Sequence, residues 1–287
     1  MSASPRLALL LLCGVLAACQ RTPTATPAPV AGATRPAQAV QLLTRHLRDN
    51  DLQAFARDAV PPALHAQLEA AWGDGRTRWP LDELPFANRL PAMLQSLAAD
   101  GAQSRLQQTF DQQFAGETLQ IRSAAASLGL FGAQYIQREG HYSASERQHY
   151  AQLIQAVSRW GLAAPLGDRD RARVTIAQLT IAAKRAGLAL PADFRAAGLE
   201  DSMRRMGRFA DVFKRAVARY GLDLDASLDG MQATLQQQTG DTAQVRMRYR
   251  LGNADIDTVV PVQRIDGRWY ISDYLQHARA AVGPSGQ

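Results

Sequence analysis

The feature that most constrains the fold of this chain is a strict alternation of apolar and basic side chains between residues 243 and 251. The apolar positions are Val245, Met247, Tyr249 and Leu251, and the basic positions between them are Arg246, Arg248 and Arg250. A period of two puts each set on its own face of a β-strand, so one face of this strand is expected to be buried. Gly252-Asn253 follows at once and suits a two-residue turn between antiparallel strands.

That turn predicts the register of the next strand. The apolar pairs are Leu251–Ala254, Tyr249–Ile256 and Val245–Val260, and the charged pairs are Arg250–Asp255 and Arg248–Asp257. A slip of one residue would break both sets of pairs, because it would move every side chain to the other face. We interpret the arginine row as a solvated face that aspartates partly neutralise; the alternative is an anion-binding stripe.

Two more strands extend this hairpin. Asp266-Gly267 predicts a second turn, which places Val262 opposite Ile271 and Arg264 opposite Trp269. Residues 231–239 pair with the first strand through a three-residue loop, which places Leu235 opposite Val245. The result is a four-stranded antiparallel meander over residues 226–278, followed by a flexible tail at 279–287. Because proline lacks the amide donor of a strand, we expect a bulge or an unpaired position at Pro261.

Most of the remaining chain has the periodicity of helices. Residues 37–79 predict N-terminal helices, and residues 80–225 predict a long helical segment in which 117–138 forms a buried helix. The clearest helix spans 199–220. Its basic face carries Arg204, Arg205, Arg208, Lys214, Arg215 and Arg219. The expected fold class is α+β: N-terminal helices and a large all-helical middle segment packed with the C-terminal meander.

The N-terminus has the layout of a secretory signal peptide over residues 1–18. Arg6 precedes the run Leu7–Ala18, which carries no charge and is shorter than the roughly 20 residues of a membrane-spanning helix. The run ends in Leu16-Ala17-Ala18-Cys19, which resembles the lipobox of bacterial lipoproteins. The resemblance implies that Cys19 receives a diacylglycerol group and becomes the first residue of the mature chain.

The residues after Cys19 extend that expectation. Residue 20 is Gln and not Asp; by resemblance to the sorting rule of enteric bacteria, this implies the periplasmic leaflet of the outer membrane. Residues 19–36 are rich in Pro, Thr and Ala without apolar periodicity, so we expect a disordered tether. Cys13 and Cys19 are the only cysteines, so the mature body would have neither a disulfide nor a free thiol.

The net charge and the motifs of the chain limit the classes of partner and cofactor that we expect. The formal net charge is +6, which in an envelope protein favours anionic lipid or an envelope protein as a partner, and not nucleic acid. Phosphate-binding glycine loops, nucleophile elbows and histidine pairs with metal-ligand spacing are absent from the sequence. We therefore expect no cofactor and no metal.

Two segments carry a resemblance to a known family. They are Ala39–Phe55, with the Pro61–Leu68 segment after it, and the run V-P-V-x-R-I-D-G-R-W-Y-I at Val260–Ile271. They resemble secreted lipoproteins of the nuclear-transport-factor-2-like, cystatin-like α+β group. The resemblance implies a curved antiparallel sheet covered by N-terminal helices, and it makes residues 80–225 a helical insertion.

The predicted register suggests a ligand pocket on the concave face of the sheet. Its candidate residues are Tyr249, Arg264, Trp269 and Asp273. Asp273 is a candidate acid/base, because burial would raise the pKa of its carboxyl group. The alternative is that Asp273 is solvated or paired with Arg264.

Three functions follow from these expectations. The leading hypothesis is a membrane-anchored periplasmic lipoprotein that acts as a non-enzymatic interaction or ligand-binding module of the cell envelope. The first alternative is a pocket enzyme of the same fold group that uses Asp273. The second is an envelope assembly adaptor that holds its partner with the basic amphipathic helix at 199–220.

Overall fold

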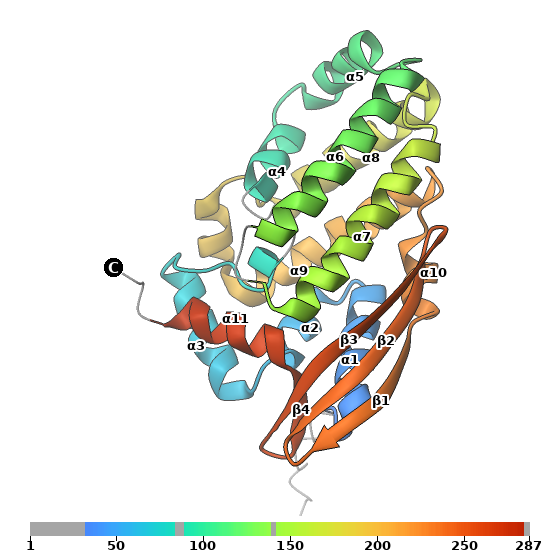
Figure 1. The fold of residues 1–287 in the computed structure, drawn as a ribbon. Coiled ribbons are helices and arrows are strands. Elements are labelled where there is room, and N and C mark those ends of the chain that lie inside the picture. Colours follow the sequence, from blue (N-terminus) through green and yellow to red (C-terminus); the bar gives the residue numbers. More distant parts are fainter. Residues whose placement is uncertain (1–31, 84–88, 139–141, 284–287) are drawn as a thin grey trace, which may run out of the picture. The chain divides into compact units, whose positions relative to one another are not determined.

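The computed structural model describes residues 32–83, 89–138 and 142–283 (Figure 1). The predicted signal peptide and Cys19 lie outside the described residues. Residues from Gly32 onward form one compact unit. The last residues of the predicted tether are packed: Ala33 is buried, and its carbonyl oxygen accepts a hydrogen bond from the amide of Trp269 at 2.9 Å.

The fold is α+β, as predicted. The helices are α1 (Pro36–Arg48), α2 (Leu52–Asp58), α3 (Pro62–Gly73), η1 (Leu81–Glu83), α4 (Leu90–Ala98), α5 (Ala102–Gln113), α6 (Thr118–Arg138), α7 (Ala144–Ala163), α8 (Arg169–Ala186), α9 (Pro191–Ala218), α10 (Leu224–Asp229) and α11 (Ser272–Val282). The strands are β1 (Gln232–Thr239), β2 (Thr242–Leu251), β3 (Ala254–Ile265) and β4 (Arg268–Ile271), and they form one antiparallel sheet in sequence order.

The predicted register of the sheet is confirmed for all three strand pairs. The turn between β1 and β2 differs from the prediction, because Thr239 already faces Thr242 and leaves a two-residue turn. A register shift between Leu235 and Gln237 absorbs the difference and still places Leu235 opposite Val245. Pairing between β2 and β3 also runs through Pro261 without a bulge.

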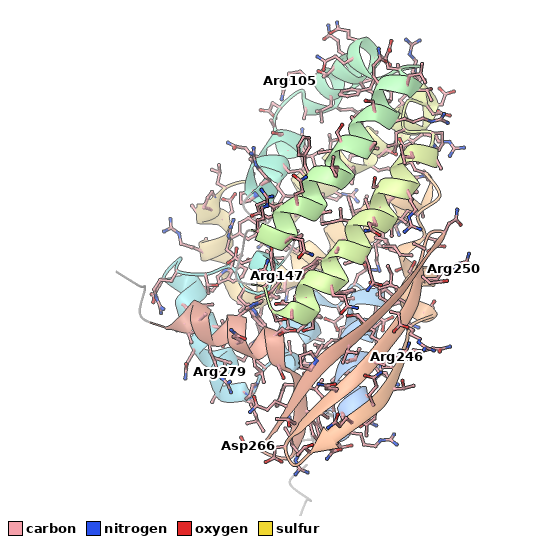
Figure 2. All side chains as sticks on the ribbon, in the orientation of Figure 1. Arg105, Arg147, Arg246, Arg250, Asp266 and Arg279 are labelled. Atoms are coloured by element: carbon pink, nitrogen blue, oxygen red, sulfur yellow. The ribbon has the colours of Figure 1, made fainter. Side chains whose placement is uncertain are left out.

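Pro261 is tolerated because of its place in the sheet. The short strand β4 pairs with residues 262–265 of β3, so none of the described strands flanks Pro261 on that side. Proline is compatible with such a sheet edge. On the outer face, the predicted pairs of Arg248 with Asp257 and Arg250 with Asp255 are present, and Arg246 also pairs with Asp257. Figure 2 shows Arg246 and Arg250 pointing away from the helices.

The helices bury three apolar clusters, and the smallest packs Ala156 of α7 with Leu222 and Leu251. Another lies between α1 and the sheet, where Val40 packs with Val245, Val262 and Trp269. The largest core joins α2, α3, α9 and α11, and its members include Phe55, Trp72, Met203 and Leu275. This largest core explains why the long helical segment between the N-terminal helices and the sheet folds with both of them.

Helix α9 covers residues 199–218 of the predicted helix 199–220 and adds a short helical stretch before it. Gly198, with a φ of 73°, breaks the helical path immediately before Leu199. Lys214 departs from the predicted basic face, because its side chain is buried. Its Nζ donates to the carbonyl oxygens of Leu47 at 3.1 Å and Arg48 at 2.8 Å, and it pairs with Asp225. Lys214 therefore supplies hydrogen bonds to carbonyl groups in the last turn of α1.

The prediction of a buried helix at 117–138 is wrong. Helix α6 packs mainly against α7, so large apolar side chains on its other sides are exposed. They are Leu119, Leu128, Leu130, Phe131 and Tyr135. The apolar composition of this segment predicts a helix, but it does not indicate how many neighbouring elements cover that helix. No helix among the described residues is long and apolar enough to cross a membrane.

Candidate functional site

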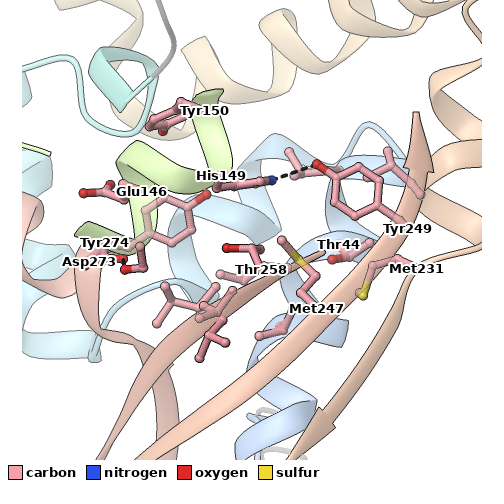
Figure 3. A pocket seen from close by; sticks show the side chains of 18 of the residues that line it. Thr44, Glu146, His149, Tyr150, Met231, Met247, Tyr249, Thr258, Asp273 and Tyr274 are labelled. Carbon is pink, nitrogen blue, oxygen red and sulfur yellow. Dashed lines mark hydrogen bonds between the residues drawn. The ribbon is translucent and has the colours of Figure 1, made fainter. Parts of the chain in front are cut away.

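A cavity of about 190 Å³ lies between the inner face of the sheet and helices α1, α7 and α11 (Figure 3). Side chains from α1, β2 and β3 form an apolar wall. They include Val40, Leu43, Leu47, Met247 and Val260. Side chains from α7 and α11 form a polar wall of Ser145, Glu146, His149, Tyr150, Asp273 and Tyr274. We refer to these two sets as the apolar wall and the polar wall.

Local sequence rules build each wall. In the apolar wall, the alternation of β2 and β3 turns Met247 and its partner Thr258 to the same face. The polar wall begins at a capping box, in which the amide of Glu146 donates to Ser143 Oγ at 3.2 Å and the amide of Ser143 donates to Glu146 Oε2 at 2.8 Å. His149 and Tyr150 follow one turn later on the same helix face.

A neutral histidine and a tyrosine meet in the cavity. His149 Nε2 lies 2.8 Å from the hydroxyl oxygen of Tyr249, and the two rings are in edge contact. Burial lowers the pKa of His149 to about 4, so its imidazole is uncharged at neutral pH. Burial also raises the pKa of Tyr249, which keeps the phenol protonated. The pair therefore offers hydrogen bonding without charge.

Carboxyl groups gather at the other part of the polar wall. Glu146 is 8% exposed and Asp273 is 9% exposed. Burial is the main cause that raises the pKa of each carboxyl group. His277 Nδ1 lies 2.5 Å from Glu83 Oε2, and His277 Nε2 lies 3.7 Å from Glu146 Oε2. Three segments far apart in sequence thus bring carboxyl groups around one imidazole.

Two further features bear on ligand chemistry. Thr258 lines the cavity at 2% exposure, and among the described residues its hydroxyl oxygen has no hydrogen-bond partner. An unpaired buried hydroxyl costs about 1–3 kcal/mol, which a ligand group would recover. Glu83, Glu146 and His277 each offer a ligand atom within 4.8 Å of the others, so these three side chains have the donor set to hold a metal ion.

The structure brings together two of the four residues predicted for the pocket. Tyr249 and Asp273 both line the cavity. Trp269 is 3% exposed and packs in the layer between α1 and the sheet. Arg264 stacks over the Trp269 ring, 5.7 Å from its centre, and pairs with Asp241. Asp273 does not lie on the sheet as predicted, because α11 begins at Ser272 and carries it in its first turn.

Several residues of the polar wall were not predicted as site residues. The capping-box spacing of Ser143 and Glu146 is visible in the sequence and marks the start of α7, but it does not indicate that Glu146 faces a cavity. His149 and His277 belong to no recognisable motif. Their positions depend on how α7 and α11 pack over the sheet, which no local pattern encodes.

The basic helix faces a different part of the molecule. Arg205, Arg208 and Arg215 of α9 line an open groove of about 840 Å³ together with Arg185 of α8. Asp201 pairs with Arg205 at 2.5 Å and Asp211 pairs with Arg215 at 2.7 Å. The groove is thus partly neutralised by residues of its own helix.

Comparison of the chain with protein-family models, with curated proteins and with solved structures finds no significant match. The geometry and chemistry of the cavity are therefore the basis for assigning a function.

Proposed function

We propose that this chain is a membrane-anchored periplasmic lipoprotein whose α+β domain binds a small, largely apolar molecule without transforming it. The observation that carries the binding role is the cavity with a mostly apolar lining and an unpaired buried hydroxyl at Thr258. Ligand sites typically combine apolar walls with a few convergent polar groups. The apolar wall supplies the first, and Thr258 with the polar wall supplies the second.

The volume of the cavity limits the size of the ligand. An apolar protein cavity of about 150 Å³ holds a benzene molecule. The cavity of about 190 Å³ therefore suits a substituted benzene or an aliphatic molecule of similar volume. The carboxyl groups of Glu146 and Asp273 and the hydroxyl of Thr258 would orient such a molecule by its polar substituent.

The binding role is tested with toluene and benzyl alcohol, titrated by NMR against the chain that begins at Gly32, where the compact unit starts. Both probes are expected to bind in the cavity. Thr258→Val keeps the shape of the side chain but removes its hydroxyl, so it should weaken benzyl alcohol about threefold to tenfold and leave toluene unchanged. If neither probe shifts cavity resonances, the ligand-binding role is wrong.

The membrane anchor of this proposal is supported by the sequence Leu16-Ala17-Ala18-Cys19 after an uncharged apolar run. The acyl chains on Cys19 would hold the protein stably at a membrane, since each buried methylene contributes about 0.8 kcal/mol. Labelled palmitate should enter the natural chain and Cys13→Ala but not Cys19→Ala. Equal labelling of the two variants would contradict the anchor.

A second candidate function is acid–base catalysis by Asp273. The supporting observation is that Asp273 lines the cavity and that burial raises the pKa of its carboxyl group, as expected of a general acid or base. The test starts from any molecule that binds the cavity and follows it by mass spectrometry. Conversion that is lost in Asp273→Asn while binding persists would favour the enzyme, whereas an unchanged molecule favours the binding role.

A further inference from the structure

The side chains in the cavity lining that can carry charge at neutral pH are all acidic. Glu146 and Asp273 both reach it, and among its described lining residues there is no lysine or arginine. His149 is the only histidine in that lining, and it is uncharged at neutral pH because burial lowers its pKa to about 4. The cavity therefore contains potential negative charge without a resident cation in the lining.

Among the described residues, the ion pair that reaches these carboxyl groups is made by His277. His277 lies between Glu83 and Glu146 and contacts both carboxylates. Ser145 donates a hydrogen bond to Asp273 Oδ2 at 3.3 Å, which is a neutral contact. Within the described part of the chain, no lysine or arginine forms an ion pair with Glu83, Glu146 or Asp273. Three carboxyl groups thus share one imidazole.

Buried negative charge of this kind is costly until a cation neutralises it. Part of that cost is visible in Glu146, whose pKa is raised by burial first and also by the nearby Asp273 and Glu83. A cation placed against Glu146 and Asp273 would let both carboxyl groups ionise. Proteins commonly meet this requirement with a lysine or arginine, and here the cavity leaves room for the cation to come from outside.

The rest of the cavity indicates what that cation is attached to. Apart from the hydroxyl groups of Thr44 and Thr258, the apolar wall offers no ligand atoms to a bare ion, and the cavity volume far exceeds that of an ion. Tyr150 and Tyr274 line the cavity close to the carboxyl groups, and aromatic rings favour ammonium groups over their faces. An ammonium group on an apolar body matches the polar wall with its charge and the apolar wall with its surface.

We infer that the natural ligand of this cavity is a small primary or secondary amine, bound as the ammonium ion, with its nitrogen at Glu146 and Asp273 and its apolar body against α1, β2 and β3. This inference rests on the proposed ligand-binding function and adds the chemical class of the ligand. Thr258 lies on the apolar side. Where the ligand carries a second polar group, the Thr258 hydroxyl can donate a hydrogen bond to it or accept one from it.

The experiment compares benzylamine, benzyl alcohol, toluene and benzoate, which share one ring and differ in charge. Isothermal titration of the chain that begins at Gly32 should give benzylamine an affinity at least about tenfold higher than that of benzyl alcohol, because ion-paired hydrogen bonds are the stronger kind. Benzoate should not bind. Equal affinity for the amine and the alcohol would overturn the inference while the ligand-binding role stands, whereas failure of all four probes would remove both.

Two variants locate the ammonium group. Asp273→Asn and Glu146→Gln should each lower the affinity for benzylamine towards that of benzyl alcohol. Toluene should bind both variants as it binds the natural chain, which shows that the cavity is intact. The matched control is Asp241→Asn, which removes a carboxylate on the exposed pair with Arg264 and should leave all affinities unchanged. Unchanged benzylamine affinity in both cavity variants would overturn the inference.

A metal ion is the competing occupant, and Zn²⁺ is titrated in parallel. Glu83, Glu146 and His277 are the relevant donors, but the contact of 2.5 Å between Glu83 and His277 already uses one donor pair. Stoichiometric Zn²⁺ binding that is lost in Glu83→Gln and that blocks benzylamine would overturn the inference in favour of a metal site. Benzylamine binding that is insensitive to Zn²⁺ and to a chelator supports the amine.

Discussion

The two walls of the cavity differ in how much of each wall local sequence patterns predict. The apolar wall comes from α1 and from neighbouring strands whose register is set by short turns. The polar wall draws its carboxyl groups from α7 and α11, with Glu83 of η1 beside them, so contacts as distant as that of His277 with Glu83 are needed. Alternation and turns thus determine the sheet side of the apolar wall, whereas the packing of α7 and α11 determines which polar groups face it.

The largest expected effect concerns the layer that supports the apolar wall. Trp269→Ala removes a buried ring between α1 and the sheet and should lower the free energy of unfolding by about 3–5 kcal/mol. Urea unfolding followed by circular dichroism measures it. The neighbouring Arg264→Ala removes an exposed side chain and should cost less than about 1 kcal/mol. Similar losses in the two variants would mean that Trp269 is not a core residue.

A smaller effect concerns the polar wall, where protonation of His149 should make the stability of the fold depend on pH. The pKa of His149 is about 4 in the folded chain and near 6.5 when unfolded. The folded chain therefore binds a proton at His149 less readily than the unfolded chain does. The free energy of unfolding has its full value above pH 6.5 and decreases as the pH falls towards 4. The loss attributable to His149 is about 3 kcal/mol.

Urea unfolding at pH 7 and at pH 4 measures this loss. His149→Gln should remove its pH dependence, because glutamine does not titrate. Tyr249→Phe deletes the hydrogen bond to His149 but keeps the burial, so its acid sensitivity should persist. If Tyr249→Phe abolished the acid sensitivity, the hydrogen bond and not burial would be its cause.

The smallest expected effect tests how the polar wall is positioned. Ser143→Ala removes the side-chain half of the capping box at the start of α7 and should cost about 1 kcal/mol in thermal unfolding. Since the same box fixes Glu146, benzylamine affinity should also fall, while toluene affinity should not. An equal fall for both probes would indicate that Ser143 supports the whole cavity and not the carboxyl group alone.

The sequence predicted the sheet well because its signals are local. Alternation in β2 and the turn at Gly252-Asn253 determine which residues face each other, and Tyr249 was correctly placed on the inner face. Asp273 was predicted on the sheet because the helix α11 begins directly after β4 without a marked boundary. The partners of Glu146 could not be predicted, since they depend on the docking of α7 and α11.

The same distinction explains the errors in the helical segment. The apolar content of α6 indicated a buried helix, but burial depends on how many neighbours a helix has, and α6 packs mainly on α7. Lys214 was predicted on the basic face of its helix, yet the C-terminal end of α1 lies against it, and its ammonium group donates hydrogen bonds to the carbonyl groups there. In both cases the periodicity placed the side chain on a helix face, and tertiary contacts decided the environment of that face.

The hydrogen bond from the amide of Trp269 to the carbonyl of Ala33 has a mechanical consequence. Through it the chain enters the fold along the edge of β4, and Gly32 lies against the side chain of Arg268. A pulling force applied before Gly32 would reach β4 before it could unwind α1. Such a force would thus be resisted first at the sheet edge beside Trp269.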